Sequence, residues 1–163
     1  MYSDLIASYN FSKMENKDTA NLLIYRVREN GLEVLLMESQ NEWSLPQGSQ
    51  NTSAIAVPFD DERVMSLDPL TFKNAVQQNM AVEADWHEIP SLKSLIREDY
   101  DLAKETIKEM IPNIMQKGTY VAIKEAFKKV MPSQYTALKE LKEIITDRDS
   151  TKYLSWILFF FIK

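Results

Sequence analysis

The feature that most constrains the fold is a pair of apolar runs separated by a tight-turn dipeptide. The runs are ANLLIYRV, Ala20 to Val27, and LEVLLMES, Leu32 to Ser39, and Asn30-Gly31 lies between them. Asn-Gly tolerates the positive φ angles that a two-residue type I′ turn requires. Both runs are apolar and bounded by polar segments, as buried strands are. The sequence therefore predicts a β-hairpin, and SAIAVPF, Ser53 to Phe59, is expected to form a further strand.

Beyond this region the apolar residues take a helical period. Asp68-Pro69 has the form of an N-cap followed by proline at the first helical position, so we expect a helix from Leu70 to about Ala84. No strand is expected between Trp86 and Lys152, because the apolar residues there recur at helical spacing. Three further helices are expected: one from Ser91 until Pro112, one from Thr119 to Met131, and one opened by Pro132-Ser133.

The pattern predicts an α+β fold in two parts. Residues 1–90 are expected to form a domain built on a sheet, and residues 91–163 a helical extension packed on it. The segment YLSWILFFFIK, Tyr153 to Lys163, is about half as long as a membrane-spanning helix. We expect it to pack on the core as a final helix turn or strand, and a membrane contact is not expected. A membrane-interface anchor and a partner-binding tail are the alternatives for this segment.

Composition excludes several kinds of chemistry. The chain has no cysteine and one histidine, which rules out thiol catalysis and multi-histidine metal sites. Its three glycines lie far apart, unlike those of a phosphate-binding glycine loop. The net charge of −5 argues against a dedicated DNA-binding domain. What remains is carboxylate chemistry with magnesium as the natural metal partner, and the absence of cysteine fits the cytoplasm, which is the predicted location.

After the predicted hairpin comes WSLPQGS, Trp43 to Ser49. This order resembles the entry to a Nudix domain, a family that reads W-x-L-P-K-G and then G-x5-E-x7-R-E-U-x-E-E-x-G-U, where U is aliphatic or aromatic. The resemblance covers Ala20 to Ser49. It implies a Nudix-like mixed β-sheet in the N-terminal half and a nucleotide-like small-molecule ligand bound near Trp43, Pro46, Gln47 and Gly48.

A second stretch, AVQQNMAVEADW, is similar to the family's catalytic helix in its apolar positions but not in its acids. Glu83 is the only acid of the family's catalytic pattern (the Nudix box) that this stretch retains. Gly48 and Gln78, the residue in the arginine position, are 30 positions apart, which is 16 more than the family pattern has. The other positions hold Asn79 and Val82 in place of acids, Asp85 in place of glycine, and Met80 and Trp86 as the apolar landmarks.

Three interpretations of function follow. The first is a catalytically degenerate Nudix-like domain that binds or regulates, with no certain cofactor and no catalytic residue assigned. The second is an active Mg²⁺-dependent pyrophosphohydrolase with relocated carboxylates, in which Asp60, Asp61 and Glu62 join Glu83 around the metal. Three adjacent acids are also typical of a solvated turn. The third is a helical interaction module that forms a homo-oligomer or binds a protein partner through its C-terminal helices.

Overall fold

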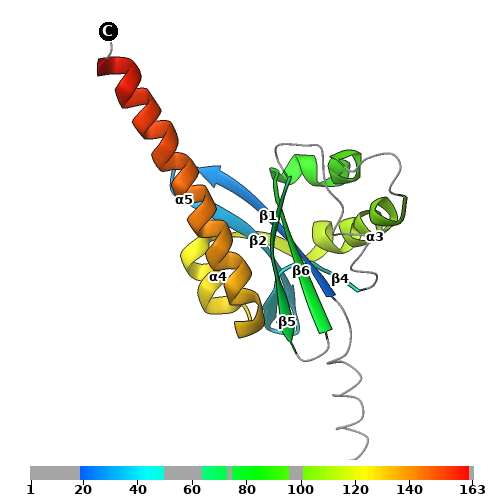
Figure 1. The fold of residues 1–163 in the computed structure, drawn as a ribbon. Helices are drawn as coiled ribbons and strands as arrows, with labels where there is room; N and C mark the ends of the chain where they lie inside the picture. Colours follow the sequence, from blue (N-terminus) through cyan, green and yellow to red (C-terminus); the bar gives the residue numbers. More distant parts are fainter. Residues whose placement is uncertain (1–18, 50–63, 73–74, 96–100, 162–163) are drawn as a thin grey trace, which may run out of the picture.

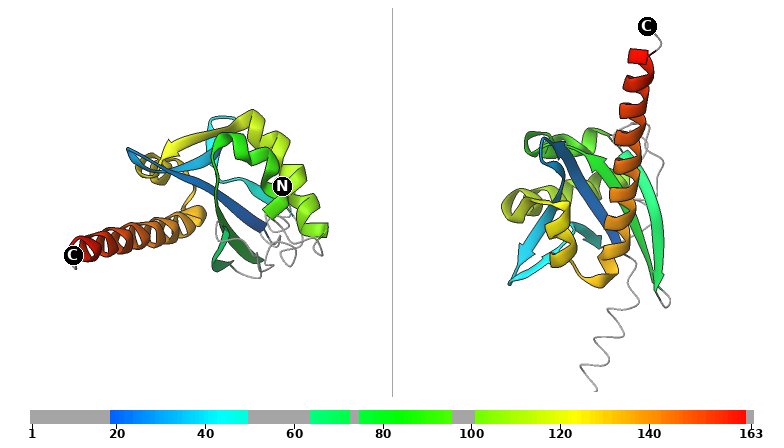
Figure 2. Two further views of the ribbon diagram at one scale, coloured as in Figure 1. Left: turned by 90° about the horizontal axis from the view of Figure 1, so that it is seen from above. Right: turned by 90° about the vertical axis from the view of Figure 1, so that its left-hand side faces the viewer.

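One mixed sheet lies between two layers of helices (Figures 1 and 2). The computed structural model describes residues 19–49, 64–72, 75–95 and 101–161. Within these ranges seven strands form the sheet, whose main path runs β3-β2-β1-β6-β5, while β4 pairs with β1 and β7 with β2. β1 and β6 are parallel and the remaining pairs are antiparallel. The predicted α+β class with a mixed sheet is confirmed.

The predicted hairpin is formed by β1, Thr19–Arg28, and β2, Gly31–Ser39. Gly31 has φ +111°, a value that side-chain-bearing residues rarely adopt. The two strands pair only near the turn, from Arg28 opposite Gly31 to Tyr25 opposite Val34. Farther from the turn β1 pairs with β4, Gln47–Ser49, and β2 with β3, Glu42–Ser44. The chain of the β3–β4 turn therefore fills the gap between the two diverging strands.

The predicted helix from Leu70 to Ala84 is wrong. This region forms a second hairpin of β5, Val64–Phe72, and β6, Ala75–Glu83. The spacing of four in Phe72, Val76 and Met80 satisfies a strand's period of two as well as a helical period, so it could not distinguish the two structures. Met80, Ala81 and Val82 are all buried because β6 is covered on both faces, which hides the alternation of a half-exposed strand.

Asp68-Pro69 does not begin a helix either. It lies at an irregularity of β5, where the pairing register shifts between Leu67 and Leu70. Proline has no N–H to donate, so a bulge on a strand at the end of the sheet path accommodates it. A proline that suits the first turn of a helix therefore also suits this position.

The second part of the chain contains one strand and several helices. The predicted helix between Ser91 and Pro112 is wrong in its bounds, since residues 91–95 belong to a 3₁₀ helix and Pro112 lies inside the α-helix Asp101–Lys117. The strand β7, Gly118–Ala122, contradicts the expectation of no strand between Trp86 and Lys152, and it replaces the start of the helix predicted from Thr119 to Met131. The helix that starts at Pro132 is confirmed. These elements are the 3₁₀ helix η1, Trp86–Leu95, α3, Asp101–Lys117, β7, Gly118–Ala122, α4, Ile123–Lys129, and α5, Pro132–Phe161.

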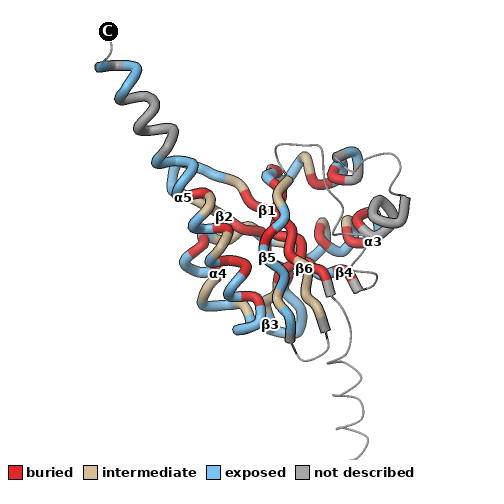
Figure 3. Tube along the Cα trace, viewed as in Figure 1, coloured by how far each residue is buried: buried red, intermediate tan, exposed pale blue. Residues whose placement is uncertain are grey.

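Alternation along β1 and β2 divides the core into two apolar clusters. Figure 3 shows the buried middle parts of both strands. Leu22, Ile24 and Leu35 face η1 and α3 through residues such as Ile89 and Ile114. On the opposite face of the sheet, Leu23, Tyr25, Val34 and Leu36 pack against α4 and α5, with Ala126, Leu138 and Leu141 fully or almost fully buried. Burial on both faces explains why the two runs in β1 and β2 are almost continuously apolar.

The end of α5 projects beyond the sheet (Figures 1 and 2). Leu158, Phe159 and Phe161 are 58%, 65% and 85% exposed. For these residues the expected packing of the apolar C-terminal segment on the core is wrong. Among the described helices, none has the length and apolar character needed to cross a membrane.

Two expectations stay predictions. The strand Ser53 to Phe59 lies outside the described residues. The division into residues 1–90 and 91–163 is untested, although β7 pairs with β2 and thus belongs to the same sheet as the first part of the chain.

Leu138→Ala should lower the free energy of unfolding by about 2–5 kcal/mol, because it leaves a cavity in the cluster beneath α5. Leu158→Ala, on the projecting end of the same helix, should change it by less than about 0.5 kcal/mol. Urea denaturation followed by circular dichroism measures both. Equal effects of the two substitutions would show that the end of α5 is packed in solution.

Candidate functional site

The WSLPQGS segment is held between β1 and β2 by its backbone. Its first residues, Trp43 and Ser44, belong to β3, which pairs with β2. Its last residues, Gln47–Ser49, form β4, which pairs with β1. Between these short strands Leu45 and Pro46 are buried, and the N–H of Leu22 donates to the carbonyl oxygen of Pro46 over 2.8 Å. The segment is thus part of the sheet and presents its polar side chains from a fixed backbone.

A cluster of side-chain amides supports this segment from within the core. The buried Asn21 of β1 donates from Nδ2 to Asn79 Oδ1 over 2.8 Å and accepts at Oδ1 from Gln47 Nε2 over 3.0 Å. Gln134 of α5 is fully buried, and its Oε1 accepts from the N–H of Leu45 over 3.1 Å. These bonds satisfy polar groups that would be costly to bury unpaired. The amides link β1, β4, β6 and α5 around the segment.

The helix α3 lies along the other side of the segment, and a cavity of about 380 Å³ opens between them. Ser44, Pro46, Gln47 and Gly48 line one wall. Met37, Met110 and Ile114 supply buried apolar surface. We call this space the α3 cleft.

The polar lining that α3 gives to the cleft consists of Glu109, Asn113 and Lys117. Residues four apart lie on the same helix face, so acid, amide and cation follow one another along one stripe. Among the described residues that line the cleft, Glu109 carries the only carboxylate. No group of three or more His, Cys, Asp or Glu side chains suited to a metal ion occurs within the described ranges.

Gly118 fixes how α3 ends. A Cβ atom at this position would lie 2.5 Å from the carbonyl oxygen of Ile114, closer than real Cβ atoms approach another atom, and 3.0 Å from Leu35 Cδ2. Only glycine therefore fits where α3 ends and β7 begins. β7 pairs with β2, and this pairing starts with Gly118 opposite Met37. Lys117, the last residue of α3, directly precedes this paired position and lines the cleft.

A second cavity, of about 420 Å³, adjoins the segment and shares Ser39, Ser44 and Gln47 with the α3 cleft. Its lining includes Trp43 and Lys129, and the Lys129 Nζ lies 4.5 Å from the centroid of a Trp43 ring. Trp43 also packs against the core cluster beneath α4 and α5. The indole thus faces this second cavity.

The structure brings together part of the predicted site. Pro46, Gln47 and Gly48 line the α3 cleft, and Trp43 lines the adjoining cavity. Glu83 lies exposed at the end of β6 and lines neither cavity. The predicted metal ligands Asp60, Asp61 and Glu62 lie outside the described residues.

The residues Asn79, Val82 and Asp85, which were aligned with the catalytic helix, lie on or just after a strand. Asn79 and Val82 are buried, and Asn79 belongs to the amide cluster. The alignment of this stretch with the box helix is therefore wrong.

Sequence reasoning missed the polar stripe of α3. A local signal exists, because residues 108–113 read K-E-M-I-P-N where the Nudix pattern reads R-E-U-x-E-E. Glu109 then matches the first acid, while Pro112 and Asn113 stand in place of the paired acids. Lys108 is 60 positions from Gly48, far more than the 14 of the family pattern, so the pattern cannot be found by spacing.

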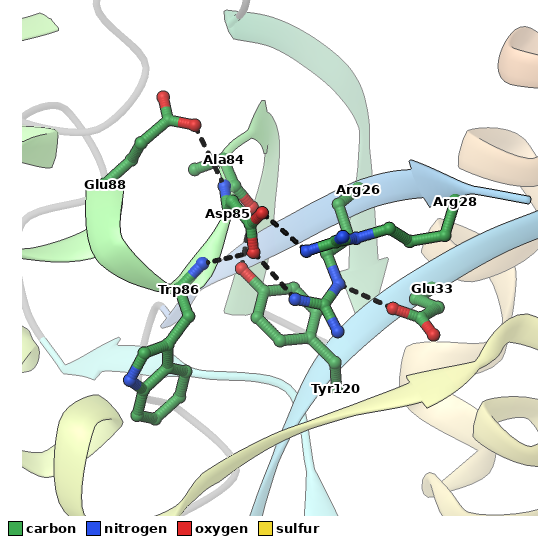
Figure 4. A network of polar contacts seen from close by, with 8 residues as sticks. All are labelled: Arg26, Arg28, Glu33, Ala84, Asp85, Trp86, Glu88 and Tyr120. Atoms are coloured by element: carbon green, nitrogen blue, oxygen red, sulfur yellow. Dashed lines mark hydrogen bonds and ion pairs between the residues drawn. The ribbon is translucent and has the colours of Figure 1, made fainter.

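A network of charged groups lies at the turn end of β1 (Figure 4). Arg26 donates to Glu33 and, over 2.7 Å, to Asp85, and Arg28 donates to Asp85 over 2.6 Å. The Arg26 guanidinium lies 3.9 Å from the centroid of the Tyr120 ring, and the Tyr120 hydroxyl donates to the Ala84 carbonyl over 2.6 Å. These contacts join β1, β2, β7 and the start of η1, so the network is structural.

The same contacts shift two pKa values. The Trp86 N–H and then Arg26 donate to the Asp85 carboxylate and lower its pKa from 3.8 to about 2. Burial raises the pKa of Tyr120 to about 12. Asp85 is therefore ionised and Tyr120 is neutral at neutral pH.

Comparison with known proteins identifies a fold. No family model and no curated protein matches the sequence. Shewanella oneidensis NrtR has a similar structure, with a TM-score of 0.50 and 10% identity over 81% of this chain, which spans only 64% of the NrtR chain. Two likenesses have lower TM-scores. A Listeria monocytogenes protein described as a Nudix hydrolase has a TM-score of 0.45 and 12% identity, and the match covers 81% of this chain and 96% of that protein. Caenorhabditis elegans Ap4A hydrolase has a TM-score of 0.41 and 11% identity, and the match covers 79% of this chain and 98% of the hydrolase chain. The chain has a Nudix-like fold.

A further NrtR structure contains a 27mer DNA. That observation concerns NrtR, and the expectation that this chain binds no DNA stays a prediction.

Gln134→Leu should lower the free energy of unfolding by about 1–3 kcal/mol, because the buried N–H of Leu45 loses its acceptor. Gln116→Leu, the same change at an exposed position of α3, should have almost no effect. Urea titration of both variants measures the difference. Equal stability of the two variants would mean that the amide cluster does not hold the segment.

Asp85→Asn should lower the thermal unfolding midpoint at pH 6, because the network loses its negative charge. The folded-state pKa is depressed, so the contribution of Asp85 is fully present above pH 3.8 and is lost as the pH falls through about 2. The difference between wild type and variant should therefore narrow between pH 4 and pH 2. Melting curves across this range test the prediction, and a constant difference would assign the effect to something other than the Asp85 charge.

Proposed function

We propose that this protein is a binding or regulatory module that takes a nucleotide-like ligand in the α3 cleft without hydrolysing it. The observation that carries the proposal is the lining of the cleft, where a segment resembling W-x-L-P-K-G faces α3, and Glu109 is the one carboxylate among the described lining residues. The shape of a ligand site is retained there, together with buried apolar surface and several polar groups.

The chemistry of the lining favours binding over hydrolysis. Nudix-like catalysis is expected to need several carboxylates that hold divalent cations, which neutralise the diphosphate and activate water. Magnesium held by a single protein carboxylate depends on phosphate and water oxygens for the rest of its shell. Glu109 is the single carboxylate among the described lining residues, and Asn113 stands where the family pattern has an acid one turn along the helix.

The alternative of an active hydrolase depends on carboxylates from elsewhere. Glu83 follows Val82 on β6, and strand alternation directs it to the face opposite Val82, whose side chain packs in the cluster beneath η1 and α3. This geometry disfavours a shared metal site of Glu83 and Glu109. The remaining ligands would have to come from other carboxylates, of which the sequence analysis names Asp60, Asp61 and Glu62.

We expect ADP to bind the full chain in isothermal titration calorimetry with no release of inorganic phosphate or AMP during hours of incubation with Mg²⁺. GDP and UDP serve as comparison ligands. Asn113→Leu, within the cleft, should weaken binding at least tenfold, whereas Gln116→Leu, exposed on the same helix and outside the lining, should leave it unchanged.

Two results would overturn the proposal. Failure of all three nucleotides to bind would remove the ligand. Mg²⁺-dependent turnover that Glu109→Gln or Glu83→Gln abolishes would make the protein an enzyme.

A further inference from the structure

The α3 cleft has a charge pattern that suggests how a ligand would lie in it. Glu109 and Lys117 are eight residues apart on one stripe of α3, which corresponds to about 12 Å along the helix axis. Asn113, which can donate and accept, lies between them. The cleft is therefore acidic at one end and basic at the other.

We propose that Lys117 binds the anionic end of the ligand directly and that binding needs no divalent cation. This inference rests on the proposed binding function and specifies its chemistry. In a site with clustered carboxylates, metal ions carry the positive charge that phosphate oxygens require. Among the described residues that line the cleft, Glu109 supplies the one carboxylate, and the Lys117 ammonium group stands two turns away on the same stripe.

The surroundings of Lys117 leave it available to a ligand. None of the ion pairs and hydrogen bonds found among the described residues uses its side chain. Further donors line the same cleft, namely the hydroxyls of Ser39 and Ser44. An ammonium group with nearby hydroxyl donors suits phosphate oxygens, since charge-assisted hydrogen bonds are the strong ones.

Glu109 sets the direction of the ligand. Its carboxylate repels phosphate and accepts hydrogen bonds from hydroxyl or amino groups. A nucleotide would therefore place its phosphates toward Lys117 and its sugar or base toward Glu109. The separation of the two charges along the helix matches a ligand with one anionic end and one neutral, donor-bearing end.

A simpler role for Lys117 is electrostatic. It lies in the last turn of α3, where a positive charge favours the helix dipole. That role would affect stability by less than about 1 kcal/mol and would not distinguish one ligand from another. A binding measurement that compares ADP with adenosine separates the two roles, because only ADP carries phosphate.

The test is calorimetry of the full chain with ADP and with adenosine, in EDTA and in excess Mg²⁺. ADP should bind equally well in both buffers and at least tenfold more tightly than adenosine. Lys117→Met should weaken ADP binding about tenfold to a hundredfold and leave adenosine binding unchanged. Lys117→Arg should restore most of the ADP affinity, and Lys108→Met, exposed on α3 and outside the cleft lining, should bind as the wild type does.

The outcomes separate this inference from the function on which it rests. ADP binding that requires Mg²⁺, or that Glu109→Gln abolishes while Lys117→Met does not, would overturn the role of Lys117 and leave a binding module. Equal affinities for ADP and adenosine would overturn it as well. Absence of binding by ADP, GDP and UDP in either buffer would overturn the proposed function itself.

Discussion

The structure depends on the way in which WSLPQGS closes the gap between β1 and β2. Two strands that separate beyond their turn leave backbone donors and acceptors without partners, and buried groups of this kind are costly. β3 and β4 pair with the two diverging strands, and Leu45 and Pro46 fill the space between. The amides of Asn21 and Gln134 then bond to the same segment from the core. The wall of the cleft formed by this segment is consequently hydrogen-bonded into the sheet.

The sheet also explains why the residues that line the cleft come from distant parts of the sequence. Both of its faces are covered, so the helical layer on one side is made from η1 and α3 and the other from α4 and α5. The site lies at the border of the first layer, where α3 meets β4 and the end of β2. Residues more than sixty positions apart in sequence therefore share one cavity.

Much of the fold could be predicted from sequence, but less of the site. Asn30-Gly31 and its flanking apolar runs predict the β1–β2 hairpin because few other structures suit that pattern. The Leu70–Ala84 region was misassigned because a spacing of four fits a helix and a strand alike, and because Pro69 suits both a helix start and a bulge. β7 is too short and too irregular in burial to signal itself. The position of WSLPQGS could be inferred from a motif, whereas Glu109, Asn113 and Lys117 come together with it only through tertiary packing.

The direct connection of α3 to β7 limits which changes in chain length the protein can tolerate at this junction. With Gly118 already paired to β2 and no linker before it, the rotation of α3 about its axis is tied to the register of a strand. Adding or deleting one residue at the junction would turn the helix by about 100° relative to the sheet. Glu109, Asn113 and Lys117 would then swing out of the cleft as a group. A substitution at the junction leaves this geometry in place, whereas a change in the length of the chain there would alter the lining of the cleft.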